Sequence, residues 1–207
     1  MDHVFPQSLY VRLPKNALTV PACLACQAAT QPDEVYFREF VASGAYRHET
    51  ARELWQRIRR SLRRDRKAAA SFHGSMRKAA VHTEAGIYLG TVDTLHADPD
   101  RINRALEKIV RGLWCAETGG GVMPADEVAW GFAYAGPLGQ RLPEAVAAVV
   151  RQLPDRTAGR EVHYRFHIAP EEPRTVLAWL LLYDSAMFAI STRSNDLAAL
   201  DANPDGA

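Results

Sequence analysis

The residue types best suited to chemistry lie near the start of the chain, where an Asp-His pair precedes a Cys-x-x-Cys sequence. Asp2 and His3 are adjacent, and Cys23 and Cys26 follow one short loop later. A carboxylate is a hard oxygen ligand for a divalent cation, and a neutral histidine beside the metal can take a proton from water. Since adjacent residues on a strand point to opposite faces, one of the pair would bind the metal and the other would reach the water.

These N-terminal residues resemble the HNH endonuclease family, whose active site is a ββα-metal finger. "DHVFPQSL" matches the Asp/Glu-His pair, bulky residue and Pro that open the family pattern. Asn16 in "PKNALTV" matches its middle Asn, and "VPACLACQAATQPDEVYFREF" corresponds to its VP-C-x-x-C-N sequence and acidic, aromatic helix. The match covers residues 2–40, about a fifth of the chain. The later segment "LEKIVRGLW", followed by a predicted all-β tail, is similar to uncharacterised bacterial proteins that carry such a finger.

The resemblance implies a metal-dependent endonuclease that hydrolyses phosphodiester bonds in DNA. Asp2 would bind the divalent metal, which is Mg, Mn or Zn in such a site, and His3 would be the general base that activates water. Asn16 would complete the catalytic site by buttressing the loop between the two strands.

Two departures from the family pattern affect the metal ligands. Gln27 occupies the position of the family's Asn or His ligand, and its amide oxygen is one methylene further out. Asp33 or Glu34, on the following helix, could replace that ligand. The two cysteines would supply half of a structural zinc site, which takes four ligands. The other Cys-x-x-Cys normally precedes the Asp-His pair, so structural zinc would need ligands upstream of Met1. Either the true start lies upstream or the finger is degenerate.

A basic amphipathic helix is predicted over residues 49–66. Leu54, Ile58 and Leu62 recur four residues apart and give it one apolar face, while six arginines fall within ten residues on the rest of its surface. Residues 1–78 carry a net charge of +7 and the remainder −6. Beside a nuclease finger, this charge favours contacts with DNA phosphates, although a solvated helix face is the simpler alternative. The predicted nucleic-acid-binding residues are Arg57, Arg59, Arg60, Arg63, Arg64, Arg66 and Lys67.

The sequence predicts an α+β fold. The short apolar runs "HVF" and "ALTV" predict two small strands, and Asp33 is placed to cap a helix that ends near Gly44. Asp98-Pro99 predicts the start of a helix that reaches residue 118. Strands predicted over 127–135, 161–169, 175–184 and 186–192 would form an antiparallel sheet covered by that helix. The chain thus divides into a ββα finger (1–43), a basic helix and linker (44–80), an α+β region (81–194) and a disordered tail (195–207).

Composition narrows the location and class of the protein. The sequence has no apolar run of about 18 residues, so no membrane partner is expected. Three cysteines do not suggest a disulfide framework, which favours the reducing cytoplasm, and an oligomer remains open. Two hypotheses follow. The first is an HNH endonuclease acting on DNA, and the alternative is a non-catalytic descendant that acts as a nucleic-acid-binding or protein-interaction module.

Overall fold

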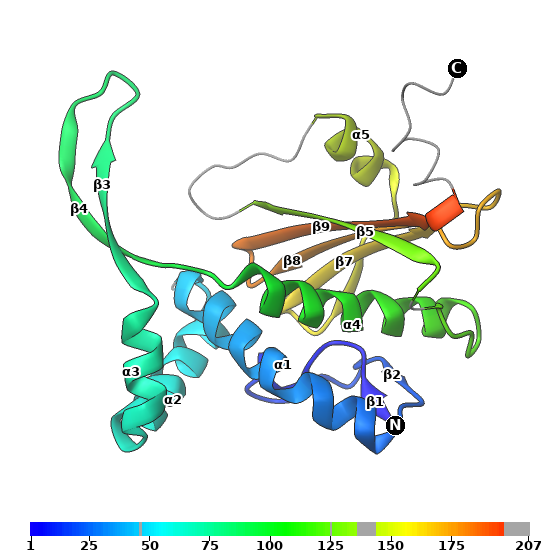
Figure 1. Ribbon diagram of the computed structural model, residues 1–207, viewed down its shortest axis with the longest axis horizontal. Coiled ribbons are helices and arrows are strands. Elements are labelled where there is room, and N and C mark those ends of the chain that lie inside the picture. The colour runs from blue at the N-terminus through cyan, green and yellow to red at the C-terminus, as the bar shows by residue number, and fades with distance from the viewer. Residues whose placement is uncertain (46, 125, 136–143, 197–207) are drawn as a thin grey trace.

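The computed structural model describes residues 1–45, 47–124, 126–135 and 144–196, and within them the fold is mixed α+β (Figure 1). The helices are α1 (Leu24–Gly44), α2 (Glu49–Arg64), α3 (Arg66–Gly74), α4 (Pro99–Glu117) and α5 (Glu144–Gln152), with a 3₁₀ turn η1 (Gln7–Leu9). The strands are β1 (Asp2–His3), β2 (Thr19–Val20), β3 (Met76–His82), β4 (Tyr88–Leu95), β5 (Val128–Ala135), β6 (Arg156–Ala158), β7 (Val162–Ile168), β8 (Val176–Leu182) and β9 (Ala186–Ser194). Of the predicted tail, residues 197–207 lie outside the described residues.

An antiparallel sheet of order β5-β9-β8-β7-β6, covered on one face by α4, confirms the predicted α+β class (Figure 1). Residues alternate between buried and half-buried along β8, as expected for a strand whose one face meets the core. Asp98 caps α4 by accepting the backbone N–H groups of Asp100 and Arg101, and Pro99 begins the helix. This helix start is the predicted one, and it orients the apolar side of α4 toward the sheet.

The N-terminal segment has the predicted order of strand, strand and helix. β1 pairs with β2 in antiparallel register, with Asp2 opposite Val20, and α1 follows. The predicted helix start at Asp33 was wrong, because α1 begins nine residues earlier at Leu24, capped by the sulfur of Cys23. Asp33 lies buried inside α1, where its carboxylate accepts hydrogen bonds from arginines of α4.

Residues 67–80, which the sequence analysis assigned to a linker, instead form most of α3 and the start of a β-hairpin. The alanines of this segment are strong helix formers, and the hairpin strands β3 and β4 pair from Met76 to His82 with one irregularity between Val81 and His82. In Figure 1 this hairpin extends away from the rest of the molecule. Its tip exposes Ile87, Tyr88 and Leu89, each more than half accessible to solvent.

One apolar core joins the N-terminal segment to the sheet. Val4 and Leu9 are fully buried in the same cluster as Leu180 and Leu182 of β8. The hydroxyl of Tyr183 also donates a hydrogen bond of 2.5 Å to the carbonyl of Leu9. Residues of the predicted finger and of the predicted α+β region therefore fold around shared apolar side chains. In the described part of the chain, no helix is both long and apolar enough to cross a membrane.

Candidate functional site

Asp2, the predicted metal ligand, is bound to a lysine of α4. Its Oδ2 lies 2.7 Å from the Nζ of Lys108, and its Oδ1 accepts the backbone N–H of His3 at 2.8 Å. The same ammonium contacts Oε1 of Glu34 on α1. All three charged side chains are less than one-fifth exposed. A single cation therefore lies between two carboxylates, one from β1 and one from α1.

His3, the predicted general base, lies next to the side-chain amide of Gln7. The amide nitrogen is 3.0 Å from Nδ1 of the His3 ring. The same amide nitrogen is 3.3 Å from Nε2, and because it can only donate, it bonds to a ring nitrogen that carries no proton. Gln27 approaches the same strand from the start of α1, and its amide nitrogen donates to the carbonyl of Met1 at 3.3 Å. The structure thus brings Asp2, His3 and Gln27 together where β1 meets α1.

Asn16 faces a different part of the molecule. Its Nδ2 donates to the carbonyl of Thr157 at 2.9 Å, and its Oδ1 accepts the N–H of Gly159 at 3.1 Å. These two bonds tie the loop between β1 and β2 to the end of β6. The side chain buttresses this loop against the sheet, and its bonds run to backbone groups there.

The two cysteines are free and exposed at the start of α1. Their sulfur atoms are 2.8 Å apart, which is a hydrogen-bond contact between thiols, and Cys23 accepts the N–H of Cys26 at 3.2 Å. The side-chain hydrogen bond between the two thiols lowers the pKa of Cys23 and raises the pKa of Cys26. The thiol of Cys23 therefore ionises more readily than the thiol of Cys26.

The donor set, as the side chains lie, does not fit a resident divalent cation. Among the residues that the structure describes, no three His, Cys, Asp or Glu side chains converge on a point that could hold a metal. The cysteines offer two of the four ligands that zinc takes, and the carboxylate of Asp2 is bound to Lys108. The predicted metal sites at Asp2, Gln27, Cys23 and Cys26 stay predictions.

Sequence reasoning named Glu34 only as a spare ligand and missed Lys108. Lys108 is separated from Glu34 by 74 positions along the chain, so no local spacing marks the contact. The only signal was the segment "LEKIVRGLW", which contains Lys108 and resembles proteins that carry the finger, although that resemblance implied no chemistry.

The predicted basic helix presents its arginines to solvent. α2 buries Ala51, Leu54 and Ile58 against the core, so its remaining surface faces outward. Arg57 pairs with Glu53 at 2.7 Å. In the described part of the chain, no ion pair engages the other six residues of the set, all of which are exposed: Arg59, Arg60, Arg63, Arg64, Arg66 and Lys67. Together with Arg57 they form what we call the α2 arginine row, which extends past the end of α2 to Arg66 and Lys67 at the start of α3.

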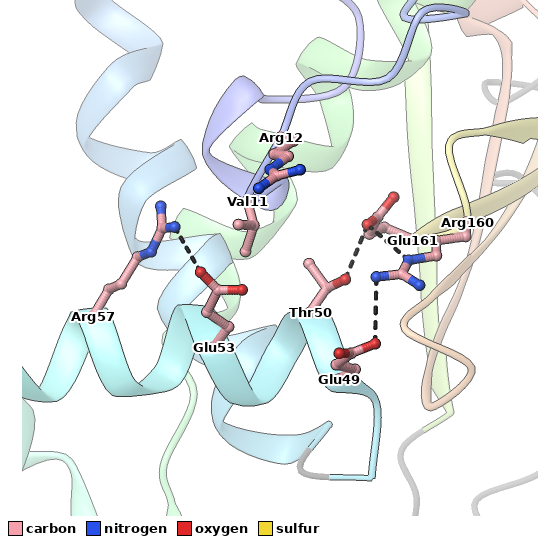
Figure 2. Close-up of a pocket in the computed structure, with 8 residues that line it drawn as sticks. All are labelled: Val11, Arg12, Glu49, Thr50, Glu53, Arg57, Arg160 and Glu161. Carbon is pink, nitrogen blue, oxygen red and sulfur yellow. Dashed lines mark hydrogen bonds and ion pairs between the residues drawn. The ribbon is translucent and has the colours of Figure 1, made fainter.

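A cavity of about 370 Å³ lies between α2 and the loop before β7 (Figure 2). Its buried polar residues are Thr50 and Glu161, and Glu161 accepts a hydrogen bond of 3.0 Å from the hydroxyl of Thr50. Arg160 lies 3.5 Å from Glu49 and 3.7 Å from Glu161, so its charge is compensated within the cavity. Sequence reasoning missed this cavity. The hydrogen bond and the ion pairs between its lining residues indicate that these residues hold α2 against the sheet.

In comparisons with protein families, curated proteins and solved structures, nothing matched this chain.

Proposed function

We propose that the protein binds DNA through its phosphate backbone, using the α2 arginine row. The observation that supports this proposal is a set of exposed, unpaired cations on α2 and at the start of α3. Six of the seven side chains have no ionic partner within the described residues, so no internal ion pair must be broken before a phosphate binds. Guanidinium groups bind phosphate oxygens through two parallel N–H bonds, and each contact releases condensed counterions from DNA.

The position of the row on a docked helix strengthens this proposal. The apolar face of α2 is held in the core by Leu54 and Ile58, so the helix backbone is ordered before DNA arrives. Only side-chain freedom is lost on binding. Since phosphate contacts carry no sequence information, we expect binding with little sequence preference.

The test is the salt dependence of binding, measured by fluorescence anisotropy with a labelled DNA duplex. Replacing Arg63 and Arg64 by Ala should lower the slope of log affinity against log salt by roughly 0.9 for each lost phosphate contact. The matched control replaces Arg151 and Arg174, which removes the same charge from side chains paired with Glu144 and Glu127. An equal loss of slope in both double variants would contradict a specific role for the row.

A second candidate is the endonuclease that the N-terminal resemblance implies. The strand, strand and helix order, with Asp2 and His3 together on the first strand, favours it. The contact between Asp2 and Lys108 weighs against it, because the carboxylate already has a cation. The test is nicking of supercoiled plasmid with Mg²⁺ or Mn²⁺, comparing the parent with His3→Ala. Nicking that survives in His3→Ala would assign the activity to a contaminant.

A further inference from the structure

Three buried hydrogen-bond donors without partners line one cavity of the protein. Among the described residues, these are the hydroxyl of Ser8, the hydroxyl of Tyr10 and the Nε–H of Arg38. The cavity measures about 370 Å³ and lies where η1 and the following loop meet α1 and α2. Arg57, Ser61 and two aliphatic side chains of α2 complete its lining. We call it the donor cavity.

Unpartnered buried donors are uncommon in folded proteins because each one loses its bond to water without replacement. Tyr10 is only 6% exposed, so its hydroxyl lies inside the protein, beside the cavity. Burial, followed by the nearby charge of Glu161, raises the pKa of Tyr10, so its hydroxyl keeps its proton at neutral pH. Three such donors at one cavity indicate that an acceptor from outside the chain belongs there.

The hydrogen-bond donors of the lining favour an anion. Two guanidinium groups and three hydroxyls line the donor cavity, and none of its described lining residues is a carboxylate. The nearest acidic partners hold the arginines by their Nη2 atoms, at 3.0 Å from Glu39 to Arg38 and 2.7 Å from Glu53 to Arg57. These ion pairs fix both guanidinium groups while the Nε–H of Arg38 stays unpaired.

We propose that the donor cavity binds a phosphate group, either as free inorganic phosphate or as a phosphomonoester. A tetrahedral oxyanion presents acceptor oxygens in several directions, and the donors come from three separate segments: η1 with its following loop, α1 and α2. Free phosphate and a phosphomonoester both carry a singly or doubly charged phosphoryl group, which accepts several N–H and O–H hydrogen bonds at once. Arg57 lines this cavity and also belongs to the α2 arginine row, so the test variants change Tyr10 and Arg38, which lie outside the row.

The decisive variant is Tyr10→Phe, which removes only the unpartnered hydroxyl. Without phosphate it should unfold at the same or a higher temperature, because a buried donor without a partner is lost. With phosphate, isothermal titration calorimetry should show an affinity about tenfold weaker, since one hydrogen bond to a charged group is missing. A residue that only supports the fold would not give stability and affinity changes of opposite sign.

The matched control is Tyr134→Phe. The hydroxyl of Tyr134 is also buried without a partner, but it lines a different, mainly apolar cavity beside the hairpin. This variant should leave phosphate affinity unchanged. Arg38→Lys keeps the charge but removes the Nε–H, and it should weaken phosphate binding at least as much as Tyr10→Phe.

The experiment uses the full chain with inorganic phosphate, with adenosine monophosphate and with adenosine. Binding of inorganic phosphate alone identifies free phosphate as the ligand, whereas tighter binding of the monophosphate identifies a phosphomonoester. Adenosine should not bind. The proposal is overturned if millimolar phosphate does not bind the parent, or if it binds Tyr10→Phe and Arg38→Lys as tightly as the parent. An unchanged salt slope for DNA in Tyr10→Phe would keep this result separate from DNA binding.

Discussion

The ammonium of Lys108 on α4 lies 2.7 Å from the carboxylate of Asp2 on β1 and also contacts Glu34 on α1. It joins three elements through one charge, at the place where the N-terminal resemblance implies a metal ion. An internal cation there stabilises the fold without a ligand, and it competes with any divalent ion for the same two carboxylates.

Removing the Lys108 ammonium should therefore leave the two carboxylates available to a divalent ion. Lys108→Met leaves two carboxylates, both less than one-fifth exposed, without a counter-charge, and it should lower the free energy of unfolding by about 2 kcal/mol. Millimolar Mn²⁺ should then raise the melting temperature of the variant and leave that of the parent unchanged. Thermal unfolding with Mn²⁺ and with chelator makes the comparison.

The control for this experiment adds Asp2→Asn to Lys108→Met, which should remove the response to Mn²⁺. If Mn²⁺ stabilised the parent as strongly as the variant, Lys108 would not be occupying the cation position, and the nuclease proposal would gain support.

Acid should destabilise the protein partly through Asp33. The hydrogen bond from Arg104, opposed by burial and aided by Arg101, lowers the pKa of Asp33. A lowered folded-state pKa contributes stability above the unfolded value of about 3.9, and this contribution disappears as the pH falls through the folded value. Asp33→Asn should thus cost about 1–3 kcal/mol at neutral pH and lose less stability on acidification.

Urea unfolding of Asp33→Asn and the parent, measured from neutral pH down to about pH 3, tests this sign. Asp93→Asn, at an exposed hairpin position, is the control. Parallel stability curves for the parent and Asp33→Asn would show that the ion pairs with α4 contribute nothing.

The two cysteines should differ in reactivity. The Cys26 thiol lowers the pKa of Cys23 by hydrogen bonding to it, so Cys23 has the larger thiolate fraction near neutral pH. Iodoacetamide should modify Cys23 first, and Cys26→Ala should slow that reaction severalfold because the bond is gone. Cys26→Ser, which keeps a hydroxyl donor, should lie between the two. Peptide mass spectrometry measures each rate, and equal rates at both cysteines in the parent would refute the assignment.

The hairpin of β3 and β4 should be removable. The buried core cluster contains no residue of either strand, and the hairpin base is closed by a backbone bond of 2.7 Å from His96 to Ser75. Replacing residues 77–94 by a short Gly-Ser turn should keep a single cooperative transition and change the free energy of unfolding by about 1 kcal/mol or less. Circular dichroism during urea unfolding measures this. A broad or multi-step transition would show that the hairpin supports the core.

Local signals explain what the sequence could predict. Asp98 and Pro99 mark a helix start through their own backbone chemistry, and the alternation along β7 follows from one buried sheet face. The helix start predicted at Asp33 was wrong because its carboxylate accepts hydrogen bonds from arginines of α4 instead of capping the start of its own helix. The helix began earlier, since a cysteine sulfur supplied the cap.

The candidate sites were harder to predict because their contacts are distant in sequence. The side chain of Asn16 forms its hydrogen bonds with backbone groups more than 140 positions away. The donor cavity depends on unpaired groups from η1, its following loop and α1, and on which face of α2 they meet. The spacing of residues in a sequence does not show which buried groups will lack a hydrogen-bond partner.

The bond from Tyr183 to Leu9 joins residues 174 positions apart, and it has a consequence for biosynthesis. A ribosome adding about 5–20 residues per second would leave Leu9 waiting for roughly 10–35 s before Tyr183 is made. Val4 and Leu9, which are fully buried in the finished protein, lack β8 throughout that interval. This segment thus waits for its native partners for most of the synthesis of the chain, and a chaperone that binds apolar segments would find it exposed during that interval.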